Sequence, residues 1–107
     1  MVRKEDSLFG FLHYLFGGRR LEHLHFVLFT RQGCHLCEEA ERLLQKEQQR
    51  YNFKLEIVDI DSQKELAAQF GKQVPVVTVN GQIRFHGGIN PVLLTRLLRA
   101  ETQSIKH

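Results

Sequence analysis

Cysteine is scarce in this chain, and long hydrophobic runs are absent. Two cysteines, Cys34 and Cys37, are too few for the disulfide scaffold of a small secreted domain. No apolar run approaches the ~20 residues that a transmembrane helix needs. The first residues are mixed in charge and no small-residue cleavage site follows the apolar residues 8–16, so we expect no secretory signal. These features favour a protein of the reducing cytoplasm.

The chain also has no strong excess of charge and no visible internal repeat. Its net charge of +3 is spread over the sequence rather than clustered in a stripe, which argues against nucleic-acid binding. With 107 residues, of which 42% are hydrophobic, the chain has the size and composition of one domain with a single core.

The N-terminal extension, residues 1–22, differs from the domain that we expect over residues 23–107. Residues 7–16 place Leu8, Leu12, Leu15 and Phe16 at helical spacing, and Gly17 follows them. The segment therefore predicts a short amphipathic helix. Two interpretations stay open: a helix or partly ordered tail belonging to the domain, or a docking surface for a partner or a membrane.

The rest of the sequence alternates between strand and helix patterns. The predicted order is β-α-β-α-β-β-α, with Asn80-Gly81 as the turn of a hairpin. Strands one and two, joined by a helix, are expected to be parallel, and the last two antiparallel. The predicted fold is an α/β domain with a central four-stranded mixed sheet and helices on both faces. The predicted segments are strand 24–30, helix 35–50, strand 53–60, helix 62–70, strands 74–79 and 82–86, and a last helix from residue 91.

Capping residues and apolar spacing predict how these helices begin and which faces they bury. Asp61 or Ser62 is expected to cap the second helix, and Asn90, followed by Pro91, the last one. The predicted buried positions of the first and last helices are Leu36, Ala40, Leu43 and Leu44, and Val92, Leu93, Leu94, Leu97 and Leu98.

Both cysteines lie in one motif, Cys34-His35-Leu36-Cys37, between a predicted strand and a predicted helix. At a helix N-terminus several backbone N–H groups have no intrahelical partner, and the helix dipole favours negative charge. This environment stabilises a thiolate, the reactive form of cysteine. The pattern predicts thiol–disulfide chemistry that requires no metal or organic cofactor. The alternatives are inert buried thiols, or a zinc site completed by two of His25, His35 and His86.

Four landmarks in this order resemble the thioredoxin superfamily: the strand ending at Thr30, the cysteine motif, Val74-Pro75, and Gly87-Gly88 before the last helix. The resemblance covers residues 23–100 and is nearest to the small bacterial glutaredoxin-like proteins. It implies a thioredoxin-like fold in which Cys34 is the nucleophile and Cys37 the resolving thiol. It also implies a cis Val74–Pro75 bond whose backbone pairs with an extended peptide or glutathione.

The same resemblance assigns candidate substrate-binding residues. Arg31 stands where glutaredoxins often carry a lysine that meets a carboxylate of glutathione, and His35 adjoins the nucleophile. After Gly87 and Gly88, glutaredoxins usually have acidic residues, whereas this chain has Ile89-Asn90-Pro91.

From these residues we expect a dithiol–disulfide oxidoreductase that reduces protein or glutathione mixed disulfides. It would act as a monomer in cell redox homeostasis and electron transport, with glutathione as a candidate reductant. The alternatives are a thioredoxin-fold binding module or redox switch, and an iron–sulfur site ligated by Cys34.

Overall fold

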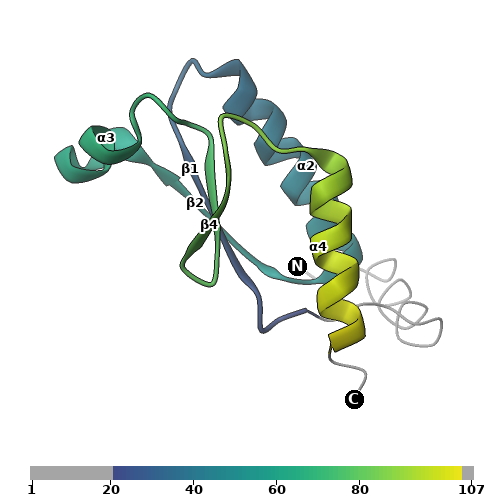
Figure 1. The fold of residues 1–107 in the computed structure, drawn as a ribbon. Coiled ribbons are helices and arrows are strands. Elements are labelled where there is room, and N and C mark those ends of the chain that lie inside the picture. The colour runs from purple at the N-terminus through teal and green to yellow at the C-terminus, as the bar shows by residue number, and fades with distance from the viewer. Residues whose placement is uncertain (1–20, 105–107) are drawn as a thin grey trace, which may run out of the picture.

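A four-stranded mixed sheet forms the centre of the molecule, with helices on both of its faces (Figure 1). The structure is a computed structural model and describes residues 21–104. The helix that we predict over residues 7–16 lies outside these residues. The strand order is β2-β1-β3-β4; β1 and β2 are parallel, whereas β3 is antiparallel to both β1 and β4. The predicted fold class is confirmed.

The order of elements along residues 21–104 also matches the prediction. A short 3₁₀ helix, η1, is the one addition, and it connects β2 to the second helix. The hairpin turns at Asn80-Gly81, where both residues have positive φ angles of 51° and 88°. The elements are β1 (His25–Thr30), α2 (His35–Tyr51), β2 (Lys54–Asp59), η1 (Ile60–Ser62), α3 (Lys64–Phe70), β3 (Val76–Val79), β4 (Gln82–His86) and α4 (Pro91–Ser104).

Two apolar clusters hold the helices against the sheet. The larger one joins α2 and α4 to one face, and includes Phe26 and Phe53, whose ring centroids are 4.2 Å apart. The smaller one lies on the α3 side and consists of Ile60, Phe70 and Val76, with Phe29 packed against it. The two faces are therefore covered unequally, because α3 has only seven residues and α2 has 17. Within the described residues, no helix is long and apolar enough to cross a membrane.

Three predicted core positions are wrong. Leu36 is 49% exposed, Val92 59% and Leu93 48%, although all three fit the apolar spacing of their helices. Each lies in the first turn of α2 or α4, where the helix begins at the edge of the core. Helical periodicity predicts the face of a residue but not how far along the helix the core extends.

The predicted cap of α3 is also wrong. The helix begins at Lys64 after Gln63, which makes no side-chain capping bond. Asp59 instead accepts a hydrogen bond from the Asp61 N–H at 2.9 Å and caps η1. The acidic residues after β2 therefore belong to a tight turn, and the Asp61 carboxylate is available for a different contact.

Candidate active site

Cys34 occupies the N-cap of α2, directly after the loop that follows β1. Its Sγ accepts a hydrogen bond from the Cys37 N–H at 3.2 Å, and its carbonyl accepts one from the Glu38 N–H at 3.1 Å. Gly33 in front of it has a φ of 77°, a left-handed conformation that favours glycine. The strand-to-helix turn thus places the thiol group of Cys34 at unpaired helix N–H groups, as predicted.

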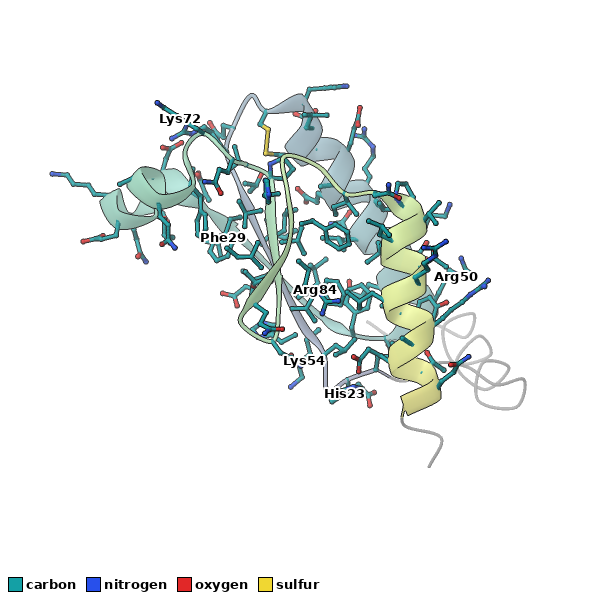
Figure 2. The ribbon with its side chains drawn as sticks, in the orientation of Figure 1. His23, Phe29, Arg50, Lys54, Lys72 and Arg84 are labelled. Carbon is teal, nitrogen blue, oxygen red and sulfur yellow. A yellow bond between two sulfur atoms is a disulfide. The ribbon has the colours of Figure 1, made fainter. Side chains whose placement is uncertain are left out.

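Cys34 and Cys37 are joined in a disulfide, with their Cα atoms 5.2 Å apart. Cys34 is half-buried, whereas Cys37 is 1% exposed. Figure 2 shows the sulfur–sulfur bond at the same end of the molecule as Lys72, with His23 and Lys54 at the opposite end. An incoming molecule therefore has access to Cys34 and very little to Cys37.

The His35 ring contacts a carboxylate on its own helix, α2. Its Nε2 atom lies 2.8 Å from a carboxylate oxygen of Glu39, one turn further along α2, and its side chain is 78% exposed. The described contact to the Cys34 sulfur comes from a backbone N–H instead. This arrangement makes the helix N-terminus, rather than the imidazole, the structural neighbour of the sulfur.

The loop before β3 lies beside the cysteine motif, because β3 begins opposite the end of β1. Phe29 pairs with Val76, and Pro75, directly before Val76, is fully buried. The Val74–Pro75 peptide bond is cis, as expected from the resemblance. The Val74 N–H donates to the Phe70 carbonyl at 3.1 Å, so this donor is used within the protein rather than offered to an added strand.

Gly87 links the end of β4 to this proline loop. Its single N–H lies 2.8 Å from both the Gln73 and the Pro75 carbonyl oxygens. Its φ is 75° and that of Gly88 is 147°, and a side chain would be strained at both. The glycine pair therefore brings the β4–α4 turn against the proline loop.

A shallow, largely apolar groove of about 310 Å³ runs from the cysteine motif to the start of α4. Leu36, which stands between the two cysteines, lines one side, and Gly88 and Pro91 line the other. The complete lining is Leu36, Glu39, Ala40, Leu43, Gly88, Ile89 and Pro91. Leu36, which was predicted to be buried but is exposed, therefore lines this groove.

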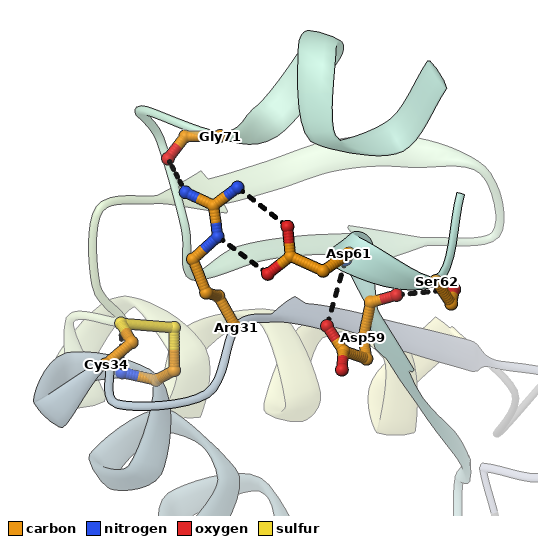
Figure 3. Close-up of polar contacts among 7 residues, drawn as sticks. Arg31, Cys34, Asp59, Asp61, Ser62 and Gly71 are labelled. Carbon is orange, nitrogen blue, oxygen red and sulfur yellow. Dashed lines mark hydrogen bonds and ion pairs between the residues drawn. A yellow bond between two sulfur atoms is a disulfide. The ribbon is translucent and has the colours of Figure 1, made fainter. Parts of the chain in front are cut away.

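Arg31 has all three of its guanidinium nitrogens in hydrogen bonds within the protein (Figure 3). Nε and Nη2 each donate to one carboxylate oxygen of Asp61 at 3.0 Å, and Nη1 donates to the Gly71 carbonyl at 3.1 Å. The hydrogen bonds between the two side chains hold the pKa of Asp61 below its ordinary value and raise the pKa of Arg31. Arg31, which stands where glutaredoxins often carry a glutathione-binding lysine, therefore joins the cysteine loop to the end of α3.

Asp61 was missed as a site residue, although the sequence contains a signal for it. Because β1 and β2 are parallel, Thr30 pairs with Asp59, and the residues that follow each strand emerge at the same edge of the sheet. A basic residue after one strand and an acidic residue after its parallel neighbour predict such a pair.

Two of the three histidines of the alternative zinc site have carboxylate partners. His25 stands at the start of β1 and its Nε2 lies 3.2 Å from Glu56, while His35 contacts Glu39. Within residues 21–104, no three histidine, cysteine, aspartate or glutamate side chains are grouped as metal ligands would be.

The fold is shared with solved structures. Protein Ne2328 from Nitrosomonas europaea is 28% identical, with a TM-score of 0.60 over 69% of this chain and 89% of that one. A protein from X. campestris is 25% identical, with a TM-score of 0.58 over 70% of this chain and 96% of that one. A mutant thioredoxin from Halobacterium salinarum is 19% identical, with a TM-score of 0.58 over 74% of each chain. A search of curated proteins finds no significant match.

The sheet order and the cysteine pair at the start of α2 define a thioredoxin-fold protein with a Cys-x-x-Cys disulfide. More specifically, the chain belongs to the glutaredoxin-like domain family (DUF836), whose model matches residues 25–99. The fold and the cysteine pair are consistent with a redox function.

Proposed function

We propose that this protein is a dithiol–disulfide oxidoreductase that reduces disulfides in proteins or mixed disulfides with glutathione. The observation that carries the proposal is the geometry of Cys34. Its sulfur is partly exposed, accepts the Cys37 N–H at the start of α2, and lies within bonding reach of a second, buried thiol. In the reduced protein this N–H and the helix N-terminus favour the thiolate of Cys34, the nucleophile in disulfide exchange.

The reaction transfers two electrons from the two thiols to the substrate. The Cys34 thiolate attacks one sulfur of the substrate disulfide, forms a mixed disulfide and releases the other sulfur as a thiolate. The Cys37 thiol loses its proton to solvent, and its thiolate attacks the Cys34 sulfur and releases the second substrate thiolate. The products are a reduced substrate and the Cys34–Cys37 disulfide, which is the form seen in the structure.

Regeneration requires a dithiol or two monothiols, and reduced glutathione is our candidate. The scheme uses no metal and no organic cofactor. We place the reaction in the cytoplasm because the starting form is a dithiol, which a reducing compartment maintains. We expect the monomer to suffice, since both cysteines come from one chain.

Single-cysteine variants test the proposal. Cys34→Ser should lower disulfide reduction to the uncatalysed rate, because the nucleophile is gone. Cys37→Ser should stop after the first step and accumulate one mixed disulfide per chain, visible as an added mass in intact-protein mass spectrometry. The assay is reduction of a protein disulfide, with circular dichroism to show that each variant is folded.

The chain offers an internal control because it has no other cysteine. Thiol titration should find no free thiol in the oxidised protein and two per chain after reduction. The double variant Cys34→Ser/Cys37→Ser should trap nothing. Full activity in Cys34→Ser would overturn the proposal. A folded wild-type protein that turns over no disulfide would instead favour the binding-module interpretation.

A further inference from the structure

The loop that carries Cys34 contains one guanidinium, and a carboxylate within the protein already holds it. Arg31 donates to both oxygens of Asp61 at 3.0 Å, the two-pronged arrangement that a carboxylate on a bound molecule would also use. Its third nitrogen is bonded to the Gly71 carbonyl at 3.1 Å. A substrate carboxylate can pair with Arg31 in this way only by displacing Asp61.

The other charged residues at this end of the molecule do not make up for the positive charge of Arg31, which Asp61 neutralises. In residues 31–39, 59–63, 71–75 and 87–91, which form the loops and adjoining residues at this end of the sheet, the fixed charges are two cations and four carboxylates. Lys72 is the second cation, is exposed, and forms no ion pair with any residue that the structure describes. Asn90 caps α4, and the first charged residue of this helix is Arg96. The six groups are Arg31, Lys72, Glu38, Glu39, Asp59 and Asp61.

Two histidines also lie at this end of the molecule. His35 contacts Glu39. His86, opposite Val76 at the end of β4, is exposed and lies outside any ion pair among residues 21–104. Apart from the histidines, the fixed charges around the cysteine pair are more negative than positive.

We propose that Asp61 is a positioning residue that determines substrate specificity: by holding Arg31, it directs the cysteine pair toward neutral or basic disulfides, as in polypeptides, and away from acidic ones such as glutathione disulfide. This inference rests on the proposed function and narrows its substrate class. Arg31 and Asp61 are a closed pair, so the site offers an acidic substrate no guanidinium, and the charged side chain that lines the groove beside the cysteine motif is the carboxylate of Glu39. The hydrogen bonds from Arg31 lower the pKa of Asp61, which agrees with a closed pair.

The test compares oxidised glutathione with its ethyl ester, in which ethyl groups mask the negative charge of the carboxylates. The variant is Asp61→Asn, which frees the guanidinium and removes one negative charge. We expect the ratio of kcat/KM for the acid to that for the ester to rise about tenfold, the order of one charge-assisted contact. The change should lie in KM for the acid and should shrink at high ionic strength.

Two further variants separate specificity from a merely structural effect. Arg31→Gln/Asp61→Asn replaces both members of the pair by neutral groups, and its ratio should stay within about twofold of the wild type, because a closed pair contributes no net charge. Glu101→Gln is the matched control, since Glu101 is a surface carboxylate that contacts His23 at the opposite end of the molecule. It should not alter the ratio.

The other outcomes overturn either this inference alone or the proposed function as well. An unchanged ratio in an active, folded Asp61→Asn variant overturns the inference and leaves the proposed function intact. A ratio that falls well below the wild type in the double variant also overturns it, because Arg31 would then bind acidic substrates despite Asp61. This second comparison does not depend on how well Asp61→Asn folds. Turnover of a protein disulfide by the wild type without turnover of the ester would overturn this inference alone. Absence of turnover with both would overturn the proposed function itself, and this inference with it.

Discussion

The N-termini of α2 and α4 lie at the same end of the sheet, and both begin with a side chain that caps the helix. Asn90 accepts hydrogen bonds from the N–H groups of Val92 and Leu93, at 2.9 and 3.2 Å. Cys34 accepts one, from Cys37, at 3.2 Å. The same local geometry therefore caps both helices, with an amide oxygen at α4 and with a sulfur of the disulfide at α2.

The two helix starts differ in what anchors them to the core. In α4 the first buried side chain is Leu94, which is fully enclosed in the larger apolar cluster. In α2 it is Cys37 itself, followed by Ala40. The start of α2 is thus held by small side chains, one of them a cysteine of the disulfide, and the start of α4 by a large apolar residue. This comparison can be tested at three sites.

The largest expected effect is at the apolar anchor of α4. Leu94→Ala should lower the free energy of unfolding by about 2–5 kcal/mol, because it leaves a cavity in the core. Leu93→Ala, at the neighbouring and half-exposed position, should change it by less than about 0.5 kcal/mol. Urea unfolding measures both. Similar losses in the two variants would show that α4 is not anchored as described.

A smaller effect is expected at the amide cap. Asn90→Ala should lower the free energy of unfolding by about 1 kcal/mol, since two N–H groups of the first turn lose their acceptor. Asn90→Asp keeps the acceptor and adds a negative charge at the helix N-terminus, so it should be at least as stable as the wild type. Thermal unfolding of the three proteins measures the order. An alanine variant as stable as the aspartate variant would show that the cap contributes nothing.

The smallest effect concerns the ion pair behind the start of α2. The folded protein lowers the pKa of Asp61, so the pair's stabilisation is complete above the ordinary value of 3.8 and is lost as the pH falls through the folded pKa. Below about pH 4, the wild type should therefore lose more stability than Asp61→Asn does. The difference should be slight because both side chains are partly exposed.

Urea midpoints at neutral and acidic pH measure this loss. Equal losses in the wild type and in Asp61→Asn would mean that the ion pair does not contribute to acid sensitivity. They would also weaken the case that Arg31 is firmly held.

The sequence predicts the elements and the position of the cysteine motif well because their causes are local. Asn80-Gly81 needs only its own backbone angles to make the hairpin, and Asn90 caps the helix that begins at the next residue. The position of Cys34 depends in the same way on the strand that ends and the helix that begins around it. Interactions within a few residues can be predicted from spacing alone.

Side-chain contacts between segments that are distant in the chain were not predicted from the sequence. Arg31 was expected to face a substrate, yet its partner is 30 residues away in the chain. Asp61 was expected to cap α3, because a short polar residue before an apolar helical pattern predicts a cap. The choice between a cap and an ion pair depends on how β1 and β2 bring the two residues together, and spacing does not contain that information.

Leu21 determines how short a version of this protein can be made. The predicted domain begins at residue 23, but Leu21 is fully buried, and its N–H donates to the carbonyl of Tyr51 at the end of α2. Its own carbonyl accepts the N–H of Leu24. A recombinant fragment that begins at Leu21 keeps the core closed, whereas one that begins at His23 opens a leucine-sized void beneath α2 and α4.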